Sequence, residues 1–282
     1  MRYLYSFIVL NFLAFSAIAQ TDSVTVDSAG KTSFIVAAVY NTNASYYGQT
    51  SAEKLPYVLT NASLKFSGGL WLSAGAYKLL NMGSGISAAD VSAGIDFDFN
   101  KSKSFTGTVS YSRSFYPKNS PLVQAANENS VGASLSYDHK LFSSSLSSDY
   151  AFGGEDDLFI SFNNSKSIPL FSFSDKDYVS IEPGIEVVAG TQCFYEYYRK
   201  QKKIRDELLD RLKDPLKPGN GNQITEVSSS KFDLLSYNFR LPLAYNRSNY
   251  LVEGSYQFSL LHDKATDNRS RSFFNLSIYY QF

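Results

Sequence analysis

The chain ends on the stretch SFFNLSIYYQF, residues Ser272–Phe282. Every second side chain from Phe274 onward is apolar or aromatic: Phe274, Leu276, Ile278, Tyr280 and Phe282. The side chains between them are mostly polar or able to form hydrogen bonds: Asn275, Ser277, Tyr279 and Gln281. Successive side chains of a β-strand point to opposite faces, so this stretch predicts a strand with one apolar and one polar face. A bare terminal aromatic residue suits a strand that ends in the aromatic girdle of a membrane barrel.

This terminal strand resembles the closing strand of bacterial outer-membrane β-barrel proteins, which ends in Phe and is read by the barrel-assembly machinery. The resemblance implies that the five outward side chains listed above form the assembly signal. It also implies that the assembly machinery and periplasmic chaperones are partners during biogenesis, and that outer-membrane lipid and lipopolysaccharide surround the finished barrel.

The other end of the chain predicts export. Met1–Ala19 has one basic residue, Arg2, then an apolar run from Leu4 to Phe15, and then Ala17-Ile18-Ala19. This order is typical of a secretory signal peptide, and its apolar run is too short for a membrane-spanning helix. We therefore expect cleavage after Ala19, a short periplasmic segment over 20–30 and a single barrel domain over 31–282.

The composition of the chain narrows the class of protein further. Aromatic residues make up 16% of the chain, mean hydropathy is −0.20, and no later segment is apolar for long enough to form a helix in lipid. An exported chain of this kind spans a membrane only as a closed barrel. The formal net charge of zero gives no electrostatic basis for binding nucleic acid. The lone Cys193 excludes an internal disulfide or a cysteine-based metal cluster, and we expect no cofactor and no metal.

Period-two runs separated by clusters of Gly, Asn, Ser and Asp predict about twelve antiparallel strands, with ten or fourteen as alternatives. They are expected at 33–42, 57–67, 69–80, 89–100, 103–115, 129–141, 143–152, 156–167, 177–191, 231–245, 249–262 and 271–282. Long connections follow most odd strands and tight ones follow most even strands, as extracellular loops and periplasmic turns do. The short connection at 153–155 and the long connection at 168–176 break this trend. A soluble β-sandwich would share the alternation of side chains, but it would not explain the terminal Phe or the unequal connections.

Parity places ten charged side chains on the inner face of the barrel: Lys65, Asp96, Asp98, Asp138, Lys140, Asp149, Glu182, Glu186, Arg240 and Glu253. Charges are costly in lipid and are accommodated in a wet lumen. Two interpretations follow. The charges either pair in a network that plugs a narrow barrel, or they line a water-filled pore whose acidic excess favours cations. A barrel of about twelve strands lies between the small filled barrels and the wide porins in size, so its size does not decide between a plugged barrel and a water-filled pore.

The connection at about 192–230 holds an amphipathic helical stripe, Ile204, Leu208, Leu212 and Leu216, after a basic cluster in Arg199–Arg205. This segment either contacts lipopolysaccharide phosphates, caps the pore or presents a solvated charged face.

Two prolines, Pro183 and Pro242, fall inside strands that are expected to be neighbours. Proline cannot donate to a ladder, so the sequence predicts either a β-bulge or a weakened seam through which something passes sideways.

No catalytic residue is predicted. His139 takes the lipid-facing parity, and His262, with Asp263 and Ser270 near it in sequence, is the one position suited to the base of a lipid hydrolase. Glu155-Asp156-Asp157 and Asp96-x-Asp98 lack the spacing of a defined calcium loop.

The Ala19-Gln20 junction and the segment Leu55-Pro-Tyr-Val-Leu59 resemble uncharacterised barrels of the Bacteroidota. We expect a passive channel or small-solute transport protein with a polar, net-acidic lumen. The alternatives are a plugged barrel that adheres through its loops and, third, a lipid-modifying hydrolase.

Overall fold

The computed structural model describes residues 32–45, 54–81, 85–117, 127–139, 141–153, 156–191, 232–262 and 270–282. The expected signal peptide, the 20–30 segment, Lys140 and the helical stripe of the 192–230 connection lie outside these ranges. Among the described residues, no helix is long and apolar enough to cross a membrane.

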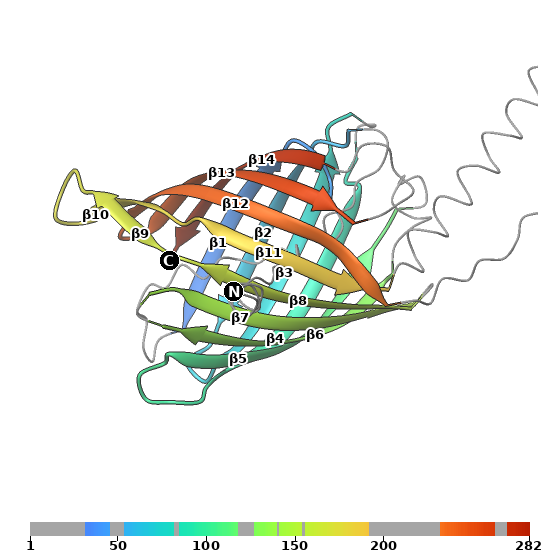
Figure 1. Cartoon of the computed structure of the whole chain (residues 1–282), viewed down its shortest axis with the longest axis horizontal. Coiled ribbons are helices and arrows are strands. Elements are labelled where there is room, and N and C mark those ends of the chain that lie inside the picture. Colours follow the sequence, from blue (N-terminus) through green and yellow to red (C-terminus); the bar gives the residue numbers. More distant parts are fainter. Residues whose placement is uncertain are drawn as a thin grey trace, which may run out of the picture.

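Fourteen strands form one antiparallel sheet (Figure 1). They are β1 (Ser33–Asn41), β2 (Tyr57–Lys65), β3 (Leu70–Leu79), β4 (Ala88–Asp98), β5 (Phe105–Phe115), β6 (Asn129–Asp138), β7 (Ser143–Phe152), β8 (Asp157–Ser165), β9 (Ile168–Phe171), β10 (Asp177–Ile181), β11 (Gly184–Gly190), β12 (Asp233–Arg247), β13 (Tyr250–Leu261) and β14 (Ser270–Gln281).

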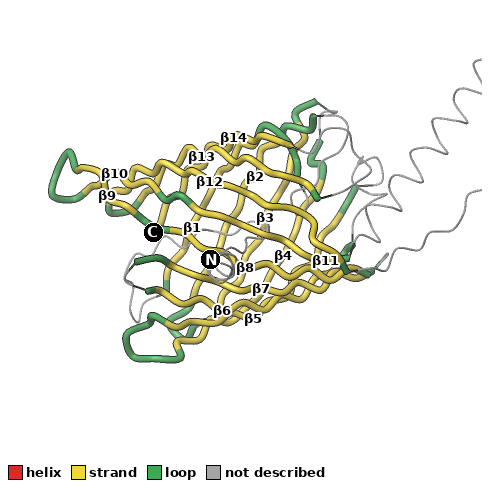
Figure 2. The backbone as a smooth tube through the Cα atoms, in the orientation of Figure 1, coloured by secondary structure: helices red, strands yellow, loops and turns green. Residues whose placement is uncertain are grey.

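The sheet closes on itself. β14 pairs with β1 from Ile35↔Gln281 to Asn41↔Asn275, and β11 pairs with both β8 and β12. β9 continues β8 and β10 leads into β11, so the wall contains twelve strands, which run obliquely across it (Figure 2). The predicted all-β, up-and-down antiparallel barrel is confirmed. The soluble sandwich is wrong, because one continuous sheet encloses the interior.

The connection expected at 168–176 is corrected by the structure. Its first part is strand β9, which pairs with β10 to form a hairpin that projects from the barrel (Figure 1). β9 has β10 as its one partner in the sheet, so Pro169 lies on an edge strand, where a missing N–H costs no ladder bond. The run Ile168-Pro-Leu-Phe171 lacks period-two alternation, which is why the pattern did not predict a strand.

Asp177 closes the turn of this hairpin. Its Oδ1 accepts the backbone N–H of Phe173 at 2.8 Å and of Ser174 at 3.0 Å, and its Oδ2 accepts the Ser174 hydroxyl at 2.7 Å. The Ser174 hydroxyl and these backbone donors lower the pKa of the Asp177 carboxyl, because they stabilise its charged form.

The outer face of the barrel is apolar and exposed, the reverse of a soluble protein. The predicted outward side chains of β14 are all exposed, from 42% for Leu276 to 69% for Phe282. Ring contacts also link Phe97, Phe99, Phe105, Tyr137, His139 and Phe142 along the end where β4, β5 and β6 meet their tight turns. An apolar belt bordered by aromatic rings is the surface that lipid covers. The barrel is therefore a transmembrane barrel. We call the end with the tight turns, Ser33 and Phe282 the turn end, and the opposite end the loop end.

Candidate functional site

The inner face divides into two regions with different packing. Polar inner side chains of β2 to β6 are mostly partly exposed, and cross-strand pairs such as Ser63↔Ser73, Ser73↔Ser92 and Ser92↔Ser112 place small hydroxyls side by side. We call this inner surface the open wall. Because serine and threonine are short, the wall leaves space in front of it and offers hydroxyls to water.

The inner surface of β8 and β11 to β13 is closely packed, and we call it the packed wall. Phe159, Val188 and Leu235 form a buried apolar cluster on it. Polar groups are buried beside that cluster: Asn163 is 2% exposed, and Asn238 donates through Nδ2 to the carboxylate of Glu186. Because these side chains have almost no exposed surface, this wall is a folded interior rather than a solvent-lined surface.

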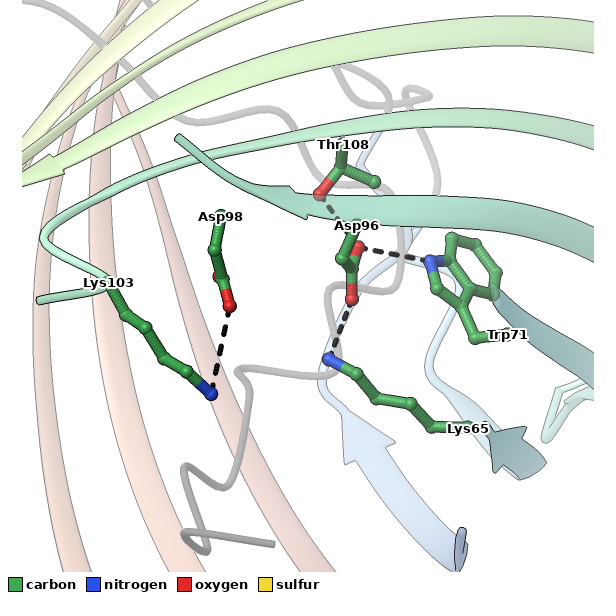
Figure 3. A network of polar contacts seen from close by, with 6 residues as sticks. All are labelled: Lys65, Trp71, Asp96, Asp98, Lys103 and Thr108. Atoms are coloured by element: carbon green, nitrogen blue, oxygen red, sulfur yellow. Dashed lines mark hydrogen bonds and ion pairs between the residues drawn. The ribbon is translucent and has the colours of Figure 1, made fainter. Parts of the chain in front are cut away.

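A charged cluster lies on the open wall near the turn end, and Figure 3 shows its six members. Lys65 Nζ lies 2.6 Å from Asp96 Oδ2. The other carboxylate oxygen of Asp96 accepts the Trp71 indole N–H at 3.2 Å and the Thr108 hydroxyl at 2.9 Å. Asp96 therefore holds three partners from three strands, β2, β3 and β5, which fixes its carboxylate in one position.

Trp71 is positioned by a glycine on the neighbouring strand. Trp71 pairs with Gly94, and its indole ring lies where a side chain at Gly94 would stand. A Cβ added there would also come within 2.9 Å of the carbonyl oxygen of Val109. The glycine thus lets the indole lie flat on the wall and reach Asp96.

Asp98 forms a second, looser pair at the same end. Lys103 Nζ lies 3.7 Å from Asp98 Oδ2, and both side chains are about half exposed. Lys103 lies in the tight β4–β5 turn, where its N–H donates to the Asn100 carbonyl at 3.1 Å, and its positive φ of 55° interrupts strand parity. Parity reasoning therefore missed this lysine. The expected strands leave a tight turn at 101–102. The position of Lys103 directly after that turn was the sequence feature that could have pointed to it.

Of the remaining predicted lumen charges, those that the structure describes lie outside this cluster. Asp138 is exposed at the turn end of β6, and Asp149 is buried against Gly132. Glu182 is exposed and accepts the Ser165 hydroxyl at 2.8 Å. Glu186 and Glu253 are buried in the packed wall, and Arg240 lies on β12 between Phe239 and Leu241. The structure therefore joins two of the ten predicted residues, Lys65 and Asp96, in an ion pair, and it pairs Asp98 with Lys103, which was not predicted.

The two histidines lie far apart. His139 contacts the rings of Tyr137 and Phe142 in the outer aromatic belt at the turn end. His262 is exposed just after β13 at the loop end, and its neighbour Asp263 lies outside the described residues. Among the residues that the structure describes, no group of three His, Cys, Asp or Glu side chains could hold a metal ion.

No family model matches this sequence, and no curated protein matches it. Among solved structures, the chain is similar to the KdgM porin, with 11% identity over 88% of this chain and 99% of that one and a TM-score of 0.47. It is similar to an outer membrane channel from Pseudomonas putida F1, with 13% identity over 90% and 96% and a TM-score of 0.49. It is also similar to LpxR from Salmonella typhimurium, with 8% identity over 88% and 99% and a TM-score of 0.44. At these TM-scores the likenesses carry no inference about this chain, whose barrel is established by its own strand pairing.

Proposed function

We propose that this protein is a bacterial outer-membrane barrel that acts as a passive channel for ions or small polar solutes. One observation carries the proposal: a continuous, partly exposed wall of short hydroxyl side chains leads to a charged cluster at the turn end. Solutes crossing a bilayer through a barrel need polar groups that replace water, and charged rings at a mouth select by sign.

The proposal includes the direction and the surroundings of the barrel. The turn end faces the periplasm and the long loops face the outside, where they meet lipopolysaccharide. Residues 1–19 direct export and are removed after Ala19, and the outward side chains of β14 are read by the barrel-assembly machinery. An origin in the Bacteroidota belongs to the same proposal and rests on the resemblance of Leu55–Leu59 and the Ala19-Gln20 junction.

The test is single-channel recording of the purified, folded protein in a planar bilayer. Discrete conductance steps are expected. A folded barrel that inserts and shows no conductance contradicts the channel. Selectivity is tested on Asp96 and Asp98, because they are partly exposed on the open wall, whereas Glu186 is 4% exposed and hydrogen-bonded to Asn238.

A second function, a plugged barrel that anchors or adheres through its loops, is favoured by the packed wall. The buried cluster of Phe159, Val188 and Leu235 fills part of the interior with apolar side chains. This function predicts a silent barrel in the bilayer and a loss of adhesion when residues 195–218 are deleted. Conductance that is present in the wild type and persists after this deletion excludes the plugged barrel.

We do not propose an enzymatic activity. Of the two histidines, His139 lies among the aromatic rings of Tyr137 and Phe142 at the turn end, and its Nδ1 accepts the backbone N–H of Leu141 at 3.3 Å. His262 remains to be tested. The variant His262→Ala is expected to leave lipid A and phospholipids unchanged by mass spectrometry. An altered lipid profile would support the lipid-hydrolase hypothesis.

A further inference from the structure

The wall around Pro183 and Pro242 is interrupted without a bulge. β10 ends at Ile181 and β11 begins at Gly184, and both pair with β12 in one register, so no extra residue is inserted here. Proline has no N–H to donate to a ladder, yet the Glu182 N–H still donates to the Pro242 carbonyl at 3.1 Å across the gap. The wall is therefore interrupted without a shift of register.

A different feature of the inner surface lies at the loop end of the open wall. Three tyrosines take the inner parity there: Tyr57 on β2, Tyr77 on β3 and Tyr116 directly after β5. Asp90 on β4 takes the same parity, and its carboxylate interacts electrostatically with the hydroxyls of Tyr77 and Tyr116. The ring centroids of Tyr57 and Tyr77 are 6.0 Å apart. We call these four residues the tyrosine cluster.

A glycine on the neighbouring strand makes room for Asp90. Asp90 pairs with Gly75, and a Cβ added to Gly75 would lie 2.5 Å from Asp90 Oδ1. The carboxylate therefore lies directly against β3. Its Oδ1 is buried there and accepts no hydrogen bond from the part of the chain that the structure describes. The side chain as a whole is half-buried, so a small molecule in the interior can still reach it.

Asp90 also forms no ion pair with the residues that the structure describes. Two basic residues lie on the neighbouring strands, and both take the outer parity. Lys78 donates to the Gly85 carbonyl at 3.4 Å, and Arg113 lies over the ring of Phe115. A carboxylate that is partly removed from water without a partner costs stability. The cluster therefore combines an uncompensated negative charge with the negative faces of aromatic rings.

We propose that the tyrosine cluster binds a small organic ammonium ion that bears N–H groups. The ammonium donates a hydrogen bond to the Asp90 carboxylate, and its charge and alkyl part lie against the rings of Tyr57 and Tyr77. A charge-assisted hydrogen bond is about twice as strong as a neutral one, and the faces of aromatic rings attract cations. A metal ion would require several oxygen ligands, whereas Asp90 is the single acid of the cluster.

This site goes beyond the proposed channel. The ligand enters from the loop end, and its binding needs no passage through the barrel. A barrel that shows no conductance in a planar bilayer therefore leaves the proposal to be decided by binding alone.

The experiment is a titration of the folded wild-type protein in detergent micelles with n-butylammonium, followed by saturation-transfer difference NMR with protein-free micelles as the blank. n-Butanol and butanoate are the neutral and anionic analogues, and tetramethylammonium is a cation without N–H groups. We expect saturable binding of n-butylammonium, about tenfold weaker binding of n-butanol and butanoate, and several-fold weaker binding of tetramethylammonium. Equal binding of n-butanol, or no saturable binding of n-butylammonium, overturns the proposal. Equal binding of tetramethylammonium overturns the requirement for N–H groups.

Variants test the residues of the cluster. Asp90→Asn is expected to raise the half-saturating n-butylammonium concentration about tenfold, because a neutral amide replaces the carboxylate. Tyr77→Leu is expected to raise it about threefold, and Tyr77→Phe, which keeps the ring, should restore most of the binding. An unchanged concentration in Asp90→Asn overturns the site.

The matched control is Asp138→Asn, which removes an exposed acid at the turn end of β6. It should leave the half-saturating concentration unchanged. An effect equal to that of Asp90→Asn would show general attraction to acidic side chains and overturn the site. The comparison of n-butylammonium with n-butanol on the wild type tests the proposal even where a variant does not fold.

Discussion

The open wall and the packed wall belong to one closed sheet, share its alternation and are both largely polar, yet they differ in what surrounds their side chains. Ser112 on β5 is partly exposed, whereas Ser259 on β13 has no exposed surface. The same residue type is therefore a lining group on one side of the lumen and a buried core group on the other. Alternation decides which face a side chain takes, while the path of the strands around the barrel decides whether water reaches it.

The largest expected effect comes from the same substitution made in both walls. Ser259→Leu forces two extra heavy atoms into a packed region and should lower the free energy of unfolding by about 1–3 kcal/mol or prevent assembly. Ser112→Leu should fold with a change of less than about 1 kcal/mol and reduce single-channel conductance, because the side chain extends into the space before the open wall. Urea unfolding in vesicles measures the first quantity and bilayer recording the second. Equal destabilisation by the two variants would remove the distinction between the walls.

A second effect tests the support of the charged cluster. Gly94→Ala places a methyl group where the Trp71 indole lies and within 2.9 Å of the Val109 carbonyl oxygen. We expect a loss of about 1–3 kcal/mol in stability and a red shift in fluorescence, since Trp71 is the single tryptophan of the chain.

Gly254→Ala is the matched control, because the nearest atom to an added Cβ there is Phe274 Cζ at 4.0 Å. It should change neither quantity. An unshifted tryptophan spectrum in Gly94→Ala would show that the indole does not depend on this glycine.

A smaller effect concerns ion selectivity. Asp98→Asn removes one negative charge from a half-exposed position on the open wall and should lower the cation-to-anion permeability ratio several-fold, since one nearby charge is worth about 1 kcal/mol in a water-like medium. Lys103→Gln removes its partner and should change the ratio in the opposite direction. Reversal potentials in a salt gradient give both values. Unchanged potentials in both variants would place the ion path away from this wall.

The smallest expected effect lies in the hairpin of β9 and β10. Because the pKa of Asp177 is lowered in the folded protein, its contribution to hairpin stability is present above the ordinary carboxyl pKa. This contribution is lost as the pH falls through the lowered value. Amide exchange of Phe173 and Ser174 should therefore accelerate below about pH 4 in the wild type. In Asp177→Asn the exchange should already be faster at neutral pH and should vary less across this range. Identical pH profiles would contradict the role of the carboxylate.

Strand positions were largely predictable, because each period-two run is a local pattern and the turns between them carry their own residues. β7 begins and ends at the predicted residues, and β14, which resembles a closing strand, pairs with β1. β9 was missed because Pro169 and the continuous apolar run hide the alternation. In the candidate site, parity identified Asp96 and Asp98 as inner residues, but the partners Trp71 and Lys103 depend on cross-strand register and on the geometry of a turn.

By itself the sequence determined the class of fold, the approximate strand limits and the face that each side chain takes, because all three depend on neighbours a few residues apart. The tertiary structure alone decided which inner side chains are buried, which charges meet and where the wall is interrupted. Lys65 and Asp96 are 31 residues apart and lie on strands that are not adjacent in the sheet. Their contact follows from the register of three strands and the curvature of the closed sheet, and no local pattern encodes either of these.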